Sequence, residues 1–142
     1  MREILFKAKR KNNGEWIEGD YNHFIDGRAG IEHTHQHLGS GIYTRVTIEV
    51  DPETVCQYTG LKDRNGKKIF EGDIVESKFT KKPYPVYFGE YSYTNEYGEE
   101  DDACGWYNIE EGKYKTALGC KTDVWATIIG NIYDNPELMG DE

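Results

Sequence analysis

Three histidines occupy alternate positions of one short segment, His33-Thr34-His35-Gln36-His37. In an extended strand, alternate side chains point to the same face and lie about 6.6 Å apart along the chain. Imidazole nitrogens bind zinc at about 2.1 Å, so two such histidines can share one ion, whereas a third requires a bend in the strand. The spacing therefore makes His33, His35 and His37 candidate zinc ligands.

Two features of this segment argue against a metal site. The H-x-H-x-D-H pattern of metallo-β-lactamase-like hydrolases is not completed, because His37 stands at the Asp position and Leu38 at the last His position. A chain of 142 residues is also too short for that fold. The neighbouring residues Gly30, Gly39 and Gly41 favour an exposed loop, where histidines are common without a metal. We expect such a loop, and a metal-dependent activity remains the alternative.

Acidic and aromatic residues are concentrated in residues 83–112. This segment holds eight Asp and Glu residues and no Lys or Arg, and it contains six of the eleven tyrosines. Without those eight acids, the remaining 18 acidic residues nearly balance the 17 basic ones, so the segment carries almost all of the net charge of −9. A charge of one sign over this length is typical of a surface that attracts a basic partner.

We interpret the segment as the part of the chain that contacts a protein partner or a second copy, because Tyr and Trp contribute much of the energy of protein interfaces. Two alternatives remain open. One is a β-hairpin with tyrosines facing inward and a solvated acidic tip, and the other is an acidic decoy that occupies the DNA site of a host protein. The candidate contact residues are Tyr91, Tyr93, Tyr97, Glu99, Glu100, Asp101, Asp102 and Trp106.

The sequence contains no other pattern typical of catalysis or ligand binding. The run 99–102 lacks the D-x-D-x-D-G spacing of a calcium loop. The nucleophile elbow G-x-S-x-G, the phosphate-binding P-loop and the dinucleotide pattern G-x-G-x-x-G are all missing. Apart from the histidine segment, we therefore identify no catalytic residues, no cofactor and no small-molecule ligand.

Cysteine use and charge indicate the compartment and the partners. Cys56, Cys104 and Cys120 are odd in number and form no C-x-x-C pair, which favours reduced thiols in a cytoplasmic protein. The N-terminal residues do not fit a signal or transit peptide, and no apolar run reaches the ~18–20 residues that span a bilayer. The acidic balance argues against direct binding to nucleic acid.

The length fits one domain, and alternation of apolar and polar residues dominates the chain. Asp51-Pro52-Glu53 and residues 136–139 predict short helical turns, and no apolar stripe long enough for a substantial helix is present. Strands are expected at 4–9, 15–24, 42–50, 67–70, 72–77, 86–93, 106–109, 114–117 and 123–132.

The expected core consists of Ile69, Ile74, Val75, Val124, Trp125, Ile128, Ile129 and Ile132. The pattern is typical of a mainly-β barrel or sandwich.

Residues 57–75 read QYTGLKDRNGKKIFEGDIV, between the opening REILFKAKR and the closing IIGNIYDNPEL. These three blocks resemble the YopX family of phage and prophage proteins over almost the whole chain. The departures are Arg64 where Lys is common, Phe70 where Tyr is common, and Lys9-Arg10 where many relatives carry Trp-Asp. The motif residues are Gln57, Tyr58, Thr59, Gly60, Leu61, Asp63, Asn65, Gly66, Glu71, Gly72, Asp73 and Ile74.

We interpret this motif as a folding signature. Gly72 allows a sharp entry into a strand, Ile74 points inward, and Asp73 caps a neighbouring turn. The resemblance implies an SH3-like barrel core at 57–138, with the acidic segment 83–112 inserted and an N-terminal β-hairpin extension within residues 1–50. It also implies a single domain over 1–142, a mobile-element origin, action in a bacterial host and no established activity. We expect a non-enzymatic accessory protein that binds a protein partner or itself.

The departure of the histidine segment from the hydrolase pattern leads to a first prediction. The purified, tag-free protein should contain no stoichiometric transition metal when its metal content is measured by elemental analysis. Close to one zinc per chain, lost in a His35→Ala variant, would instead support the metal-dependent alternative.

Overall fold

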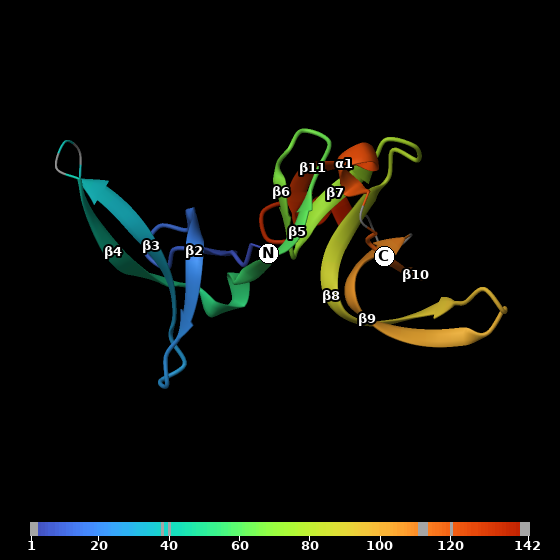
Figure 1. The fold of residues 1–142 in the computed structure, drawn as a ribbon, viewed down its shortest axis with the longest axis horizontal. Helices are drawn as coiled ribbons and strands as arrows, with labels where there is room; N and C mark the ends of the chain where they lie inside the picture. Colours follow the sequence, from blue (N-terminus) through green and yellow to red (C-terminus); the bar gives the residue numbers. More distant parts are fainter. Residues whose placement is uncertain (1–2, 38, 40, 111–113, 120, 140–142) are drawn as a thin grey trace. The chain divides into compact units, whose positions relative to one another are not determined.

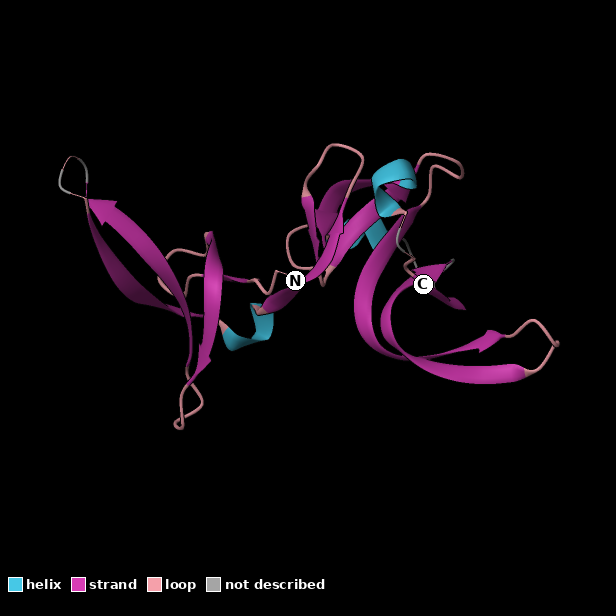
Figure 2. Cartoon of the chain, viewed as in Figure 1, coloured by secondary structure: helices cyan, strands magenta, loops and turns pink. Residues whose placement is uncertain are grey.

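The structure, a computed structural model, describes residues 3–37, 39, 41–110, 114–119 and 121–139, and at 33–37, 43, 110 and 114 it describes only the backbone. The chain divides into two compact units, Met1–Tyr58 and Thr59–Glu142. Antiparallel strands dominate both units (Figures 1 and 2). Among the described residues, none of the helices has the length and apolar character needed to cross a membrane. The assignment of the whole chain to one domain stays a prediction.

The first unit is a meander of antiparallel strands. In the sheet the order is β4-β3-β2-β1, and the start of β5 pairs with β1. Its core contains the fully buried Ala8, Ala29, Ile31 and Val50. The elements are β1 (Phe6–Lys9), β2 (Trp16–His23), β3 (Ala29–His37), β4 (Ile42–Val50), the 3-10 turn η1 (Pro52–Thr54) and β5 (Cys56–Lys62), whose end belongs to the second unit.

The second unit combines a short hairpin with a five-stranded sheet. The end of β5 pairs with β6, and the sheet has the order β10-β9-β8-β7-β11. The elements after β5 are β6 (Lys68–Phe70), β7 (Asp73–Ser77), β8 (Pro83–Thr94), β9 (Glu100–Glu110), β10 (Tyr114–Ala117), α1 (Thr122–Trp125), β11 (Ala126–Asn131) and the 3-10 turn η2 (Pro136–Met139). The core consists of Ile69, Val75, Tyr84, Val86, Leu118 and Ala126.

Asp63, in the turn between β5 and β6, joins this hairpin to β11. The side chain is 1% exposed, and its Oδ1 accepts hydrogen bonds from the backbone N–H groups of Asn65 and Lys67, both at 2.9 Å. Its Oδ2 accepts one from the N–H of Ile128 at 3.0 Å. Burial raises the pKa of this carboxyl, but the three amides outweigh burial and lower its pKa below the ordinary value.

The Glu-Gly-Asp-Ile run forms the entry to β7. Gly72 has φ of 86°, a conformation that favours glycine, and a Cβ there would meet the Tyr133 ring at 3.2 Å. Asp73 Oδ2 accepts a hydrogen bond from the backbone N–H of Phe70 at 2.8 Å, so this side chain closes the turn that precedes its own strand. Ile74 is completely buried. These residues have structural roles in the turn and the core.

The mainly-β prediction is confirmed, and helical residues in the described part of the chain are confined to α1, η1 and η2. The predicted strand 42–50 coincides with β4. Asp51 caps η1 by accepting a hydrogen bond from the N–H of Glu53 at 3.0 Å. The strands form two sheets rather than a closed ring, so the SH3-like barrel is not confirmed by the strand pairing.

Two expected core residues are on the surface. Residues 122–125 form α1 instead of the start of the predicted strand 123–132, which leaves Val124 47% exposed. Ile129 is 37% exposed, because Ala126 and Ile128 pack on the core and the alternation along β11 turns Ile129 to the other face. Ile129 is also the residue left out of the pairing where β11 shifts register against β7, so the prediction that Ile129 faces the core is wrong.

These positions lead to a second prediction. Ile74→Ala should lower the free energy of unfolding by about 2–5 kcal/mol, because it removes a fully buried side chain. Ile129→Ala should lower it by about 1 kcal/mol or less, because this side chain already meets water. Urea titrations of both variants measure the difference, and equal losses would contradict the outward placement of Ile129.

The Asp63 contacts lead to a third prediction, which concerns acid stability. A carboxyl whose pKa is lowered on folding stabilises the protein above its ordinary pKa of 3.8, and this stabilisation is lost as pH falls through the lower folded value. Wild type should therefore exceed Asp63→Asn in stability at pH 7, and the gap should shrink below about pH 4. Urea unfolding at several pH values tests this, and a gap independent of pH would contradict it.

Candidate functional site

Strands β8 and β9 form a long hairpin that contains most of the acidic segment. Their pairing runs without interruption from Val86 opposite Asn108 to Thr94 opposite Glu100 (Figure 1). The turn at the tip is closed by Asn95, whose Oδ1 accepts hydrogen bonds from the N–H groups of Tyr97 at 2.9 Å and Glu99 at 3.0 Å. The hairpin therefore presents a defined tip at residues 95–99.

One face of this hairpin carries a row of tyrosines, which we name the tyrosine face: Tyr87, Tyr91, Tyr93 and Tyr107. Ring centroids are 6.0 Å apart between Tyr87 and Tyr107, 6.0 Å between Tyr107 and Tyr91, and 6.4 Å between Tyr91 and Tyr93. Burial, together with the nearby Tyr107, raises the pKa of the Tyr87 hydroxyl. The row begins at this half-buried ring and ends at Tyr93, which is 43% exposed.

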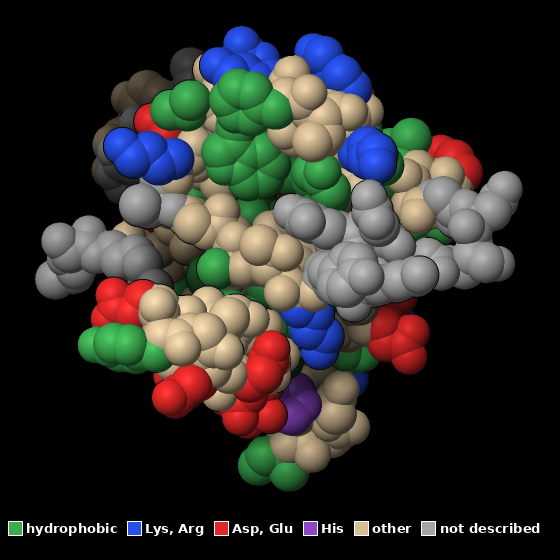
Figure 3. Space-filling model, turned by 90° about the vertical axis from the view of Figure 1, so that its right-hand side faces the viewer, with side chains coloured by type: hydrophobic (Ala, Val, Ile, Leu, Met, Phe, Trp, Pro, Cys, Tyr) green, Lys and Arg blue, Asp and Glu red, His purple; other side chains and the backbone are tan. Residues whose placement is uncertain are grey.

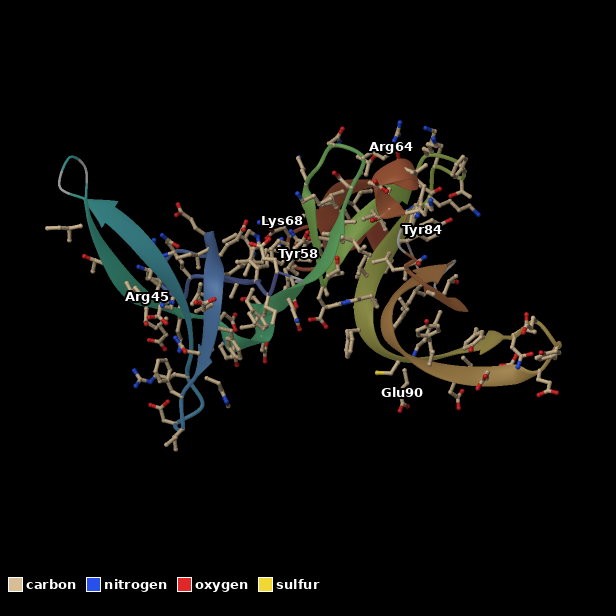
Figure 4. All side chains as sticks on the ribbon, in the orientation of Figure 1. Arg45, Tyr58, Arg64, Lys68, Tyr84 and Glu90 are labelled. Carbon is tan, nitrogen blue, oxygen red and sulfur yellow. The ribbon has the colours of Figure 1, made fainter. Side chains whose placement is uncertain are left out.

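The opposite face carries Glu90, Glu100 and Asp102, and we name it the acidic face. Asp102 lies opposite Ser92 and Glu100 lies opposite Thr94. The Ser92 hydroxyl donates to Asp102 Oδ1 at 2.8 Å, and the Thr94 hydroxyl donates to Glu100 Oε1 at 3.4 Å. Both carboxylates are exposed, and the hydroxyl contacts leave their charge unneutralised. Figure 4 shows Glu90 projecting from the hairpin at its bend.

The same face becomes apolar towards the base of the hairpin. Phe88 and Trp106 face each other edge-to-face, with ring centroids 5.0 Å apart, and Phe88 is 53% exposed. Trp106 packs against the core of the unit. The hairpin thus continues the core at its base and leaves it towards the tip.

The structure distributes the predicted contact residues over three surfaces. Tyr91, Tyr93 and Asp101 share the tyrosine face, whereas Glu100, Asp102 and Trp106 share the acidic face. Tyr97, 79% exposed, and Glu99 belong to the tip. Tyr87, Tyr107, Phe88 and Glu90 were not among the predicted contact residues. The alternation of side chains along the two strands was the signal that could have assigned each of them to a face of the hairpin.

The backbone of residues 33–37 lies in β3 and pairs with β4, so the expected loop at the histidines is wrong. His33, His35 and His37 alternate along this strand, opposite Val46, Thr44 and Ile42. Their side chains, and the metal site considered for them, lie outside the described residues. Among the side chains that are described, no group of three or more His, Cys, Asp or Glu is arranged to hold a metal ion.

Two cysteines of the described chain, Cys56 and Cys104, lie in different surroundings. Cys56 is buried, and its Sγ lies 3.1 Å from the carbonyl oxygen of Thr54, to which the thiol donates. Cys104 is exposed on the acidic face, opposite Glu90. Cys120 lies outside the described residues.

Fold and site together define a mainly-β protein of two antiparallel units, the second of which carries an acidic, tyrosine-rich hairpin. The profile of the YopX protein family matches residues 5–140, so the chain belongs to the YopX family. Among solved structures, it is similar to protein EF1440 from Enterococcus faecalis, with 22% sequence identity over 99% of this chain and 100% of that chain and a TM-score of 0.46. The comparison with curated proteins found no match.

Proposed function

We propose that this protein is a non-enzymatic protein-binding module, an accessory protein of a phage or prophage acting in the cytoplasm of the bacterial host. The β8–β9 hairpin is its binding element, and the partner presents a basic surface. The observation that carries this proposal is the composition of residues 83–112, with eight acids, six tyrosines and no Lys or Arg.

The distal hairpin exposes both faces, and each face supplies a different part of recognition. Tyrosines offer a large apolar ring and a polar hydroxyl at low entropic cost, which suits them to the centre of an interface. Exposed carboxylates contribute little to folding, but they raise the rate of encounter with a basic surface. A hairpin that exposes both kinds of side chain can therefore steer a partner by its charge and also hold it through its rings.

Support for an open SH3-like barrel in the second unit comes from the attachment of the β5–β6 hairpin to β11. Ile69 of β6 belongs to the same buried cluster as Val75 and Ala126 of the five-stranded sheet. The hydrogen bond from the Ile128 N–H to Asp63, and one from the Thr122 hydroxyl to the carbonyl oxygen of Lys62 at 2.9 Å, join the two parts. This barrel-like core would anchor the binding hairpin.

The fourth prediction tests the hairpin as the binding element. In a variant in which Glu99, Glu100, Asp101 and Asp102 are all changed to Ser, partners captured from bacterial lysate should fall at least about tenfold at low salt, because the steering charge is removed. The melting temperature should stay nearly unchanged, because these four side chains are exposed at the distal end of the hairpin. Quantitative mass spectrometry of the captured proteins and thermal unfolding measure the two effects.

A matched control removes the same amount of charge elsewhere. Glu15, Glu18, Glu53 and Glu137 are exposed and lie outside residues 83–112, and their joint change to Ser should leave capture unchanged. Equal capture by the wild type and the hairpin variant would contradict the proposal. Captured proteins consisting only of DNA-binding proteins would identify the hairpin as an acidic decoy.

A further inference from the structure

The second unit also carries a cluster of positive charge around an exposed aromatic ring. The loop between β7 and β8 contains Lys78, Phe79 and Lys81, and Phe79 is 72% exposed. The Lys78 ammonium lies 5.1 Å from the centroid of the Phe79 ring. The loop is closed by a hydrogen bond from the Lys81 N–H to the carbonyl oxygen of Ser77 at 2.8 Å, so these side chains project from a hydrogen-bonded turn.

Two other segments extend this cluster. The N–H of Lys78 donates to the carbonyl oxygen of Trp125 at 2.9 Å, which places the loop beside α1. The N–H of Arg64 donates to the carbonyl oxygen of Ala126 at 2.9 Å, which places the β5–β6 turn beside the end of α1. We name the resulting surface the basic patch; its residues are Arg64, Lys78, Phe79, Lys81, Lys121 and Val124.

The charge of the basic patch is available to a partner. None of the ion pairs between described side chains involves Arg64, Lys78, Lys81 or Lys121. Asp123 is the one acidic residue of α1. Figure 3 shows Lys and Arg side chains around an exposed apolar surface at the upper edge of its view, and Figure 4 labels Arg64 beside α1.

We propose that the partner of the acidic hairpin is a second copy of this chain, and that the hairpin tip of one copy binds the basic patch of the next. This inference rests on the proposed function, because it names the partner of the same hairpin. The two surfaces are complementary in charge, and each presents one strongly exposed aromatic ring, Phe79 on the patch and Tyr97 on the tip.

The geometry of β8 requires the contact to form between copies. The strand begins at Pro83, directly after the basic loop, and ends at Thr94, directly before the tip. Its 12 residues, at about 3.4 Å each, separate the two surfaces by roughly 40 Å along the strand. Pairing with β9 over most of this length prevents β8 from folding back, so the tip cannot reach the patch of its own chain.

A contact between two different surfaces of identical chains is heterologous. Such contacts produce a closed ring or an open filament, depending on the rotation between neighbours. The net charge of −9 would disfavour association if it were spread evenly. Instead, the negative charge is concentrated on the hairpin, and the basic patch lies at the opposite end of β8. Electrostatic attraction between two copies is therefore strongest when the hairpin of one faces the basic patch of the other.

Sedimentation velocity of the full chain tests the proposal, with three reversal variants. The patch variant is Lys78→Glu with Lys81→Glu, and the tip variant changes Glu99, Glu100, Asp101 and Asp102 to Lys. The control variant is Lys11→Glu with Arg28→Glu, which reverses two exposed charges of the first unit. It changes the net charge of the chain by the same amount as the patch variant does.

Wild type and control variant should self-associate, and the association should weaken at least about tenfold between about 0.1 M and 1 M salt, as the Debye length falls from about 10 Å to 3 Å. The patch variant and the tip variant should each be monomeric. An equimolar mixture of the two should associate, because the unchanged tip of one chain meets the unchanged patch of the other.

Three results would overturn the proposal: a monomeric wild type, oligomers of the patch variant as stable as those of wild type, or a mixture that stays monomeric. Circular dichroism of each variant separates lost association from lost folding. A monomeric wild type would show that the partner of the hairpin is not a second copy. The proposed function is tested by a different result: it fails if the serine variant of the hairpin captures the same proteins as wild type.

Discussion

The buried carboxylate of Asp63 is the contact on which the second unit depends. Its two oxygens bind backbone amides of the β5–β6 turn and of β11, segments more than sixty positions apart in the chain. A buried carboxylate is stable only when it is well hydrogen-bonded, and here three amides meet that demand. Through β11 the same contact orders β7, and through β7 it orders the base of β8.

The way the hairpin is presented follows from this anchoring. Tyr84 and Val86 at the base of β8 are buried in the core, so the strand leaves the core in a fixed register. Beyond the base, the period of two sends the tyrosines to one face and Glu90, Glu100 and Asp102 to the other, while Asp101 shares the tyrosine face. A hairpin held in a fixed register loses less conformational entropy when it contacts a partner.

Net charge alone gives a misleading view of this protein. The overall value of −9 suggests mutual repulsion between copies, yet Lys78 and Lys81 lie in the loop that carries Phe79, while eight of the acids lie in residues 83–112. Because exposed charges act over about one Debye length, the local distribution decides which surfaces meet. A single long strand, β8, keeps the two distributions apart.

Local patterns in the sequence were sufficient for much of the secondary structure. The alternation at 42–50, the Asp51 cap and the Gly72-Asp73-Ile74 turn each depend on residues a few positions apart, whose backbone geometry is set locally. The acidic, tyrosine-rich composition of the candidate site was equally visible in the sequence.

Tertiary structure alone decided the rest, because these features depend on contacts between distant segments. Ile129 faces outward because Ala126 and Ile128 of the same strand pack on the core, and the adjacent Ile128 and Ile129 do not themselves show which of them faces inward. The histidine segment is a strand because β4 supplies its hydrogen-bond partners. The basic patch exists because backbone hydrogen bonds place Arg64 and Lys78 beside the end of α1, which joins residues that the sequence holds far apart.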